Sequence, residues 1–274
     1  MVSSMLQKRD AHYWDIASKY WSDIATVNPH WAWSTFYCER ISDKPLDILV
    51  VGVTHGAFLK LLRKFRPQAW VCGIDLSFNM LKEAQKAEKK VVCCRGNALP
   101  FRDEEFDIVL SDYFLSVIPE NILEETVHEM GRVLKKDGVL IAKELRHRGH
   151  IVLWALSLGG TGILFTVSAF VVPWLAVIFG PLWVLTLFAY NPVKHTPGKT
   201  AAVFKWVLHV LKFAKRRKRL PTGKEMSDLY YLSQKYLHIF TDGEVDRAFE
   251  NSPLTMDREV TLLSWSFSLE GVKT

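Results

Sequence analysis

The sequence has few cysteines, and they are not arranged for a structural role. Cys38, Cys72, Cys93 and Cys94 are the only ones in 274 residues, and they show neither metal-ligand spacing nor a paired framework. A disulfide scaffold is therefore excluded, no metal is expected, and reduced core thiols are predicted. The first ten residues also lack an apolar stretch, so no signal peptide is expected.

Acidic residues are absent from one long stretch. Between Leu145 and Lys224 there is no Asp or Glu, whereas the same stretch holds 12 Lys and Arg residues. The net charge of +6 is therefore local, because the rest of the chain has 23 basic against 29 acidic residues. A short basic run beside an apolar region favours an anionic membrane surface over nucleic acid as its partner.

Charged residues and histidine are both missing from residues 151–193. One membrane crossing takes about 20 residues, so this run is long enough for a hairpin of two helices. Pro173 near its middle predicts the bend, and basic residues on both flanks place both ends, with the rest of the chain, on the cytoplasmic side. The alternatives are a buried apolar helix pair and a shallow re-entrant hairpin, which Gly159 and Gly160 would permit.

A basic amphipathic pattern follows over residues 200–220. Lys205, His209, Lys212 and Arg216 share one helical stripe, with Phe204, Val207, Leu208 and Leu211 on the other side. A helix with one cationic and one apolar face is suited to lie in a membrane interface, and residues 215–219 add a compact cationic cluster. The alternative is a merely solvated helix face.

Short apolar runs alternate with amphipathic stretches between Asp47 and Glu144. They predict strands over 47–52, 70–75, 91–94, 106–110 and 139–143, and helices over 57–65, 78–87 and 122–134. Such βαβ units form a parallel sheet with helices on both faces. We therefore expect an α/β fold, a Rossmann-like and mostly parallel sheet, with the hydrophobic helical hairpin and the amphipathic basic helix as insertions.

The chain divides by composition into four parts. An N-terminal helical cap is expected over 1–46, a Rossmann-like core over 47–145 and the membrane-associated insertion over 146–224. Residues 225–274 return to globular composition, with a helix capped by Thr241 and a closing strand over 260–269.

Glycines and polar residues follow the predicted strands. The first strand leads into Gly52-Val-Thr-His-Gly56, which lets the backbone approach a ligand closely. The second strand ends in Asp75, 23 positions after Gly52, where a carboxylate can bind both hydroxyls of a ribose. Residues 96–101 read Gly-Asn-Ala-Leu-Pro-Phe, and Phe-Asp-Ile-Val-Leu110 follows them closely.

Together these segments resemble the class I methyltransferases, in particular the ubiquinone/menaquinone C-methyltransferase-like (methyltransferase type 11) group. The segment from Asp15 to Tyr20 resembles the part of those enzymes that covers the cofactor, and Glu129 to Gly138 resembles their turn into strand five. The resemblance extends from Asp15 to Glu144. It implies S-adenosylmethionine as the cofactor.

The same resemblance implies which residues hold the cofactor. Asp75 would bind the ribose, Met80 would pack on the adenine, and the glycine loop would line the methionine portion. The full implied set is Tyr20, Gly52, Thr54, Gly56, Asp75, Leu76, Met80, Asn97, Ala98, Leu99 and Ser111.

The sequence departs from the family pattern at three positions. Val50 and Thr54 replace an acidic residue and a glycine of the first motif, and Asn97 replaces the acidic residue that receives the adenine amino group. The oxygen of an Asn side chain can still accept that hydrogen bond, without charge assistance.

Two carboxylates follow the last strands and are candidates for a catalytic base. Asp112 lies just beyond strand four, and Glu144 ends strand five with His147 beyond it. Asp112 is equally consistent with a capping or turn role. A cluster of His30, Trp31, Trp33 and Tyr37 is expected to form either a lid over the acceptor or part of the core.

The sequence thus predicts a membrane-associated methyltransferase acting on a hydrophobic or lipid-like acceptor, such as a prenylated quinone or phenol, a lipid amine, an isoprenoid or a lipophilic thiol. The alternative is a non-catalytic membrane adaptor that keeps the fold, which the departures at Val50, Thr54 and Asn97 would explain.

Overall fold

The computed structural model describes residues 2–24, 36–37, 39–145, 158–166, 180–181, 184, 199–234, 241–259 and 266–274. These residues form two compact units. The first comprises Met1–Glu144, Gly243–Glu259 and Ser268–Thr274, and the second comprises Leu145–Asp242 and Val260–Phe267.

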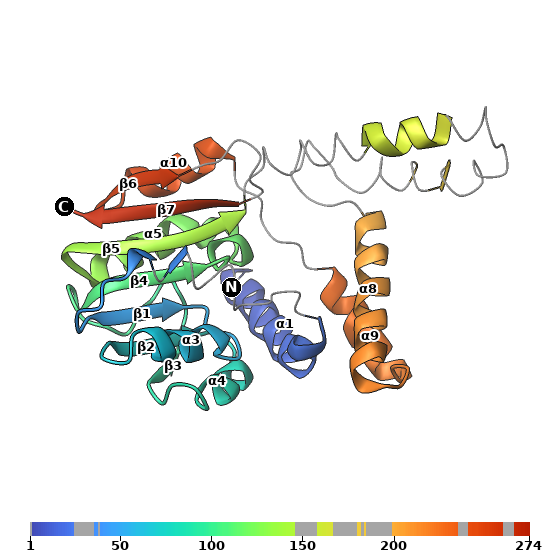
Figure 1. The fold of residues 1–274 in the computed structure, drawn as a ribbon, viewed down its shortest axis with the longest axis horizontal. Coiled ribbons are helices and arrows are strands. Elements are labelled where there is room, and N and C mark those ends of the chain that lie inside the picture. The colour runs from blue at the N-terminus through green and yellow to red at the C-terminus, as the bar shows by residue number, and fades with distance from the viewer. Residues whose placement is uncertain are drawn as a thin grey trace. The chain divides into compact units, whose positions relative to one another are not determined.

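The first unit is built on one twisted sheet with the strand order β3-β2-β1-β4-β5-β7-β6 (Figure 1). Neighbouring strands from β3 to β5 are parallel, and β6 pairs with β7 in antiparallel register. The predicted mostly parallel α/β sheet is therefore confirmed. The strands are β1 (Asp47–Val51), β2 (Trp70–Asp75), β3 (Val91–Cys93), β4 (Phe106–Asp112), β5 (Leu134–Leu145), β6 (Leu254–Glu259) and β7 (Ser266–Lys273).

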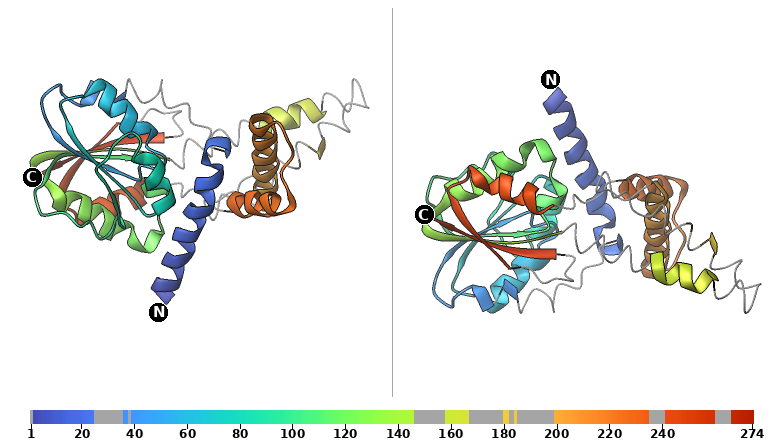
Figure 2. Two further views of the ribbon diagram at one scale, coloured as in Figure 1. Left: turned by 90° about the horizontal axis from the view of Figure 1, so that it is seen from below. Right: turned by 90° about the horizontal axis from the view of Figure 1, so that it is seen from above.

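Helices cover both faces of the sheet, which is why the central strands read as continuous apolar runs. Figure 2 shows α3 on one face and α5 with α10 on the other. Tyr37, Ile48, Val50, Leu59 and Leu110 belong to a core cluster on the α3 face. The helices of this unit are α1 (Val2–Ile24), α3 (Ala57–Phe65), α4 (Phe78–Ala84), α5 (Leu123–Val133) and α10 (Asp242–Glu250), with short 3-10 turns η1 (Leu115–Val117) and η2 (Glu120–Ile122).

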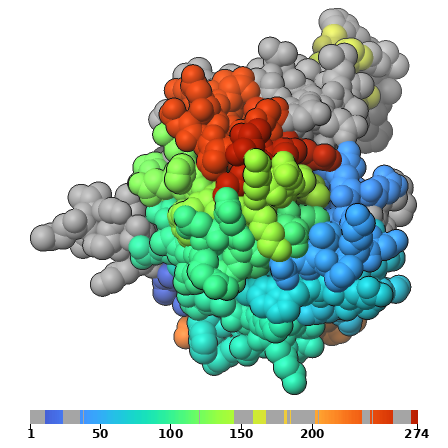
Figure 3. Space-filling model, turned by 90° about the vertical axis from the view of Figure 1, so that its left-hand side faces the viewer, coloured from blue at the N-terminus to red at the C-terminus, as the bar shows by residue number. Residues whose placement is uncertain are grey.

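The C-terminal strands complete this unit differently from the prediction. Figure 3 shows the red residues of these strands beside the yellow-green residues of β5. The sequence predicts one closing strand over 260–269. In the structure β6 ends before this range, and β7 begins within it and continues beyond its end. Residues 260–265 lie outside the described part. The expectation of core cysteines holds for Cys72 but is wrong for Cys93, which is exposed because β3 is an edge strand.

The predicted hairpin over 151–193 lies mostly outside the described residues. Within it, residues 158–166 are helical, and Ile163 and Leu164 are exposed. No helix in the described part of the chain has the length and hydropathy needed to cross a membrane.

The second unit contains a pair of packed helices, α8 (Lys199–Arg217) and α9 (Gly223–Ser233). Helix α8 matches the helix predicted over 200–220, but its cationic stripe is exposed only at Arg216 and is partly or fully buried at Lys205, His209 and Lys212. His209 is only 7% exposed and Lys205 is half-buried, whereas Val207, Leu208 and Leu211 are exposed. The reason is α9, which the sequence analysis missed: His209 hydrogen-bonds to the backbone of Leu229 and packs against this partner helix.

Candidate functional site

The carboxyl ends of the parallel strands gather most of the predicted site residues. In a parallel sheet these ends share one edge, and the crevice outside them is where open α/β folds bind ligands. Strands β1 to β5 run in the same direction in Figure 1, so the loops after β1, β2, β3 and β4 meet at that edge.

The loop after β1 turns sharply over the end of β2. The backbone N–H groups of Gly52 and Val53 both donate to the Ile74 carbonyl, at 2.9 and 3.0 Å. Gly52 and Gly56 have φ of 75°, and Thr54 has φ of 49°. A side chain at Gly56 would place its Cβ 2.7 Å from Ala84 Cα, so only glycine lets α4 pack this closely.

Asp75 at the end of β2 organises the loop electrostatically. Its two carboxylate oxygens each accept one backbone hydrogen bond of 2.9 Å, from Thr54 and from Ser77. The residue is 8% exposed, and burial raises its pKa against these hydrogen bonds, which favour the charged form. The backbone N–H of Leu76 also hydrogen-bonds to this carboxylate. A carboxylate has about four acceptor sites, so acceptor capacity remains for a hydroxyl group.

The side chain of Asn97 has one polar atom with a hydrogen-bond partner and one without a partner in the described part of the chain. Its Nδ2 donates to Glu125 at 2.8 Å, which orients the amide. Its buried Oδ1 has no hydrogen-bond partner among the residues that the structure describes. Buried polar atoms are normally paired, so this oxygen points to a donor that the protein does not supply. An exocyclic amino group of a nucleobase is such a donor.

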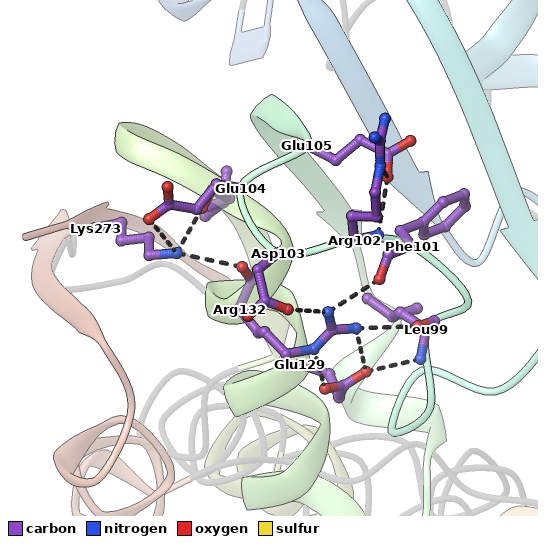
Figure 4. Close-up of polar contacts among 10 residues, drawn as sticks. Leu99, Phe101, Arg102, Asp103, Glu104, Glu105, Glu129, Arg132 and Lys273 are labelled. Carbon is purple, nitrogen blue, oxygen red and sulfur yellow. Dashed lines mark hydrogen bonds and ion pairs between the residues drawn. The ribbon is translucent and has the colours of Figure 1, made fainter.

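The loop from Gly96 to Phe101 is held in place by an ion-pair cluster on α5, drawn in Figure 4. Glu129 accepts a hydrogen bond of 2.8 Å from the backbone N–H of Leu99. Arg132 donates to the carbonyls of Leu99 and Phe101 at 3.0 and 2.9 Å, and it pairs with Glu129 at 2.6 Å. The backbone that follows the Asn97–Ala98 segment is therefore fixed by α5.

Helix α1 lies against α4. Asp15 accepts hydrogen bonds from the Ser77 hydroxyl at 2.8 Å and from Asn79 at 3.3 Å. Tyr20 is buried at 5% exposure. Met80 is fully buried and so belongs to the packing beneath α4, whereas Leu76 is half-exposed and presents apolar surface next to Asp75.

Glu144 at the end of β5 is a fully buried carboxylate with four donors. It accepts from the hydroxyls of Ser111 and Ser116 at 3.3 and 2.7 Å, and from the backbone N–H groups of Leu115 and Ser116 at 3.0 Å each. Burial raises its pKa to about 7, although all four hydrogen bonds favour the charged form. These contacts hold the η1 turn and indicate a positioning role for Glu144.

Asp112 lies on the opposite face of the sheet from Glu144. Ser111 pairs with Ala142 in the strand register, and side chains alternate along a strand, so Ser111 and Glu144 share one face while Asp112 faces the other. There Asp112 accepts a hydrogen bond of 3.3 Å from the Tyr37 hydroxyl. Burial, with the negative charge of Glu144 as a second cause, raises the pKa of Asp112 well above its usual value.

Phe114 covers two of the glycines of the site. A Cβ on Gly52 would meet its Cδ2 at 2.7 Å, and a Cβ on Gly96 would meet its Cζ at 2.7 Å. The ring therefore occupies the space that both glycines leave open, next to the η1 turn that Glu144 holds.

The structure brings together Gly52, Thr54 and Asp75, and it separates Asp112 from Glu144. Of the predicted aromatic cluster, Tyr37 is a core residue and the other three lie outside the described part, as does His147. The sequence pattern does not predict a site role for Phe114 or for the supporting residues Asp15, Ser77, Glu129 and Arg132. Ser77 alone carried a local signal, because Ser before an apolar helix is a typical N-cap.

Part of the chain is similar in sequence to known methyltransferases. Residues 49–142 match the methyltransferase domain family. The demethylmenaquinone methyltransferase of Staphylococcus carnosus is 35% identical over 157 residues, which cover 53% of this chain and 64% of that enzyme. An uncharacterized protein of Methanocaldococcus jannaschii is 38% identical over 95 residues, which cover 34% of this chain and 42% of that protein. The chain thus spans less than half the length of the latter relative.

Solved structures agree in fold. An S-adenosylmethionine-dependent methyltransferase of Methanosarcina mazei superposes with a TM-score of 0.51 at 15% identity, covering 87% of this chain and 97% of that one. One from Aquifex aeolicus gives 0.51 at 13% identity, covering 94% and 98%. Residues 49–142 are therefore similar to the methyltransferase domain family within a Rossmann-like methyltransferase fold, and both findings support S-adenosylmethionine as the cofactor.

Proposed function

We propose that the chain is an S-adenosylmethionine-dependent methyltransferase that acts on a hydrophobic or lipid-like acceptor at a membrane. The observation that carries the methyltransferase part is the donor set at the carboxyl edge. Asp75 keeps acceptor capacity beside a glycine loop. Asn97 Oδ1 is buried and receives no hydrogen bond from the residues that the structure describes. Ribose hydroxyls and an adenine amino group have the hydrogen-bond donors that these oxygens need.

The bound cofactor would supply a methyl group activated on a sulfonium. The residues of this chain have to orient the acceptor, keep water away and, for an acceptor that carries a proton, remove that proton. Asp112 is the candidate base, because burial raises the pKa of its carboxyl well above the usual value, which makes it a stronger proton acceptor, and because Tyr37 holds it by a hydrogen bond. Glu144 acts through the η1 turn and is proposed as a positioning residue.

The membrane part of the proposal is supported by composition. Residues 151–193 contain no charged residue, and basic residues flank them on both sides. We propose that this segment anchors the chain, with the sheet unit on the cytoplasmic side, and gives a lipid-soluble acceptor a path that avoids water. The similarity to a quinone-modifying enzyme over about half of the chain is compatible with a lipid-like acceptor, whose identity stays open.

The test uses membranes that contain the chain. They are incubated with S-adenosylmethionine labelled in its methyl group and then extracted for lipid, with membranes carrying Asp75→Ala as the control. Label in the lipid fraction of the wild type alone is the expected result. Resistance of the chain to carbonate extraction tests the anchor separately, and release by carbonate would contradict it.

The alternative of a non-catalytic adaptor is favoured by one observation. Val50, which stands where the family has an acidic residue, is 3% exposed and packs in the core cluster on the α3 face. No carboxylate is therefore available at that position to order the loop. An adaptor would bind the cofactor normally and yet transfer no label to lipid or to water-soluble acceptors.

A further inference from the structure

Helix α8 is held against α9 by the face that carries its polar residues. Ala202, His209 and Phe213 are buried on α8, and Leu229 and Leu232 are buried on α9. The Trp206 side chain donates to the Met226 carbonyl at 3.3 Å, and its ring meets Tyr230 edge-on at 5.9 Å. The contact face is thus fixed by packing and by hydrogen bonds between the helices.

The opposite face of α8 is apolar and exposed. Val203, Val207 and Leu211 follow one another at intervals of four, and Leu208 lies beside them. All four are exposed, Leu211 at 60%. Single exposed apolar residues are common on protein surfaces, whereas a continuous row of them is typical of an interaction surface. The row on α8 therefore indicates such a surface.

Cationic side chains continue this apolar row. Lys215 follows Leu208 and Leu211 at seven and four residues, so it lies on the same helix face. Lys215, Arg216 and Lys218 are all exposed at the end of α8.

Not every cation of the cluster is available to a partner. Arg219 forms a two-pronged ion pair with Glu225, with N–O distances of 2.7 and 2.6 Å. Arg217 and Arg219 also lie over the Phe213 ring, at 5.0 and 5.1 Å from its centre. These two arginines therefore brace the turn between α8 and α9, and the charge that faces outward comes from the other three residues.

We propose that the exposed α8 row of Val203, Val207, Leu208 and Leu211, extended by Lys215, lies on an anionic lipid bilayer while α9 holds the other face. This deepens the proposed function, since it names the surface that meets the membrane. The helix would enter the interface with its apolar row toward the acyl chains and the exposed cations of its C-terminal end among anionic headgroups. Lys205 and His209 would contact α9 and not the lipid.

Charge argues for lipid over a second copy of the chain. Helix α8 has no acidic residue, and none occurs from Leu145 to Lys224. Two parallel α8 faces placed together would set like charges opposite each other, which is unfavourable, and in an antiparallel pair the facing helix would offer these cations no acidic partner. An anionic bilayer instead offers opposite charge and an apolar interior along the same helix.

Photo-crosslinking in the full chain tests the surface. Benzoylphenylalanine is introduced at Val207 or Leu211 and, as the control, at Ser227, which is exposed on α9. The chain is reconstituted into vesicles of phosphatidylcholine with or without phosphatidylserine that carry a labelled acyl chain. We expect several-fold more lipid adduct at 207 and 211 than at 227, with a further rise when phosphatidylserine is present.

A second variant distinguishes loss of the lipid-binding surface from loss of the α8–α9 packing. Leu211→Glu should remove the lipid adduct at Val207 while the α8–α9 amides keep their protection from hydrogen exchange, because Leu211 does not face α9. Equal lipid adduct at all three positions, or adducts between two copies of the chain, would overturn the proposal. Cofactor binding measured by titration stays intact in either case, so failure here is distinct from failure of the methyltransferase assignment.

Discussion

The two units bury ionisable groups of opposite kind. The sheet unit buries the acids Asp75 and Glu144, whereas the α8–α9 pair buries the base His209 and half-buries Lys205. Burial favours the neutral form in both cases, so it raises the pKa of Glu144 to about 7 and lowers that of His209 to about 4. One physical cause therefore predicts opposite pH responses in two parts of one chain.

The two units also differ in how they compensate this burial. Glu144 has three donors from the η1 turn and a fourth from Ser111 on β4. Asp75 accepts backbone hydrogen bonds from Thr54, Leu76 and Ser77. His209 has one bond to the Leu229 backbone and a buried Nδ1 that has no partner among the described residues. The acids thus organise a site, whereas the histidine is tolerated in a packing face.

The largest expected effect concerns Glu144. Its folded-state pKa is raised, so between pH 4.5 and 7 the folded state holds a proton that the unfolded state releases, and stability falls as pH rises through that window. The change amounts to about 3 kcal/mol. Glu144→Gln should reduce this slope in the unfolding free energy of the sheet unit, measured by hydrogen exchange of β5 amides, and the raised pKa values of Asp75 and Asp112 should leave the remainder. Glu124→Gln, on the exposed side of α5, is the control, and parallel curves for wild type and Glu144→Gln would contradict the prediction.

An effect of similar size and opposite sign is expected at His209. Its folded-state pKa is lowered, so stability is fully present above pH 6.5 and is lost as pH falls toward 4. His209→Leu should remove this loss of unfolding free energy, which amounts to about 3 kcal/mol. Hydrogen exchange of the α8 and α9 amides measures it. His128→Leu on α5 should leave their pH profile unchanged. If wild type and His209→Leu lose protection together on acidification, another group sets the slope.

A third prediction tests whether the acids of the sheet unit serve a ligand. Asp75→Ala should weaken S-adenosylmethionine binding by about 2–3 kcal/mol, because charge-assisted hydrogen bonds are lost. Calorimetric titration measures it, with the exposed Glu124→Ala as the matched variant. Unchanged affinity in a folded Asp75→Ala protein would remove the cofactor assignment of this edge.

The sheet could be predicted from the sequence because strands that are buried on both faces appear as continuous apolar runs. Runs such as Ile48 to Val51 are apolar without alternation, and glycine or Asp75 ends them. The carboxyl edge then follows from topology alone. The topology does not determine which side chains form hydrogen bonds with each other or with a loop. The hydrogen bonds from Arg132 to the Leu99 carbonyl and from Ser116 to Glu144 were therefore not predicted.

Helix α8 shows why an amphipathic pattern does not fix orientation. The stripe of Lys205 and His209 reads as a solvent or headgroup face when the helix is considered alone. The partner helix begins with Thr222-Gly-Lys-Glu225, a capping box present in the structure, and this signal was available but overlooked. The aliphatic part of a lysine side chain can cover apolar surface, and a neutral histidine can be buried against another helix. The stripe of Lys205 and His209 can therefore face α9 and not solvent.

The smallest of these effects is expected at Arg132. This residue holds the loop that carries Asn97, and it is not among the residues proposed to contact the cofactor. Arg132 joins α5 to the Leu99 and Phe101 carbonyls, and its side chain touches neither Asn97 nor Asp75 in any contact described above. Arg132→Met should weaken cofactor binding by about 1–2 kcal/mol by loosening the loop that carries Asn97, since a loop carbonyl loses its donor. As a positioning residue it should raise KM for the cofactor and leave kcat nearly unchanged, and Arg132→Lys should restore little because lysine cannot span both carbonyls. Arg102→Met is the control, because Arg102 is 91% exposed and pairs only with Glu105 among the ion pairs drawn in Figure 4. A fall in kcat at constant KM would place Arg132 in the chemistry of transfer and contradict its role as a support.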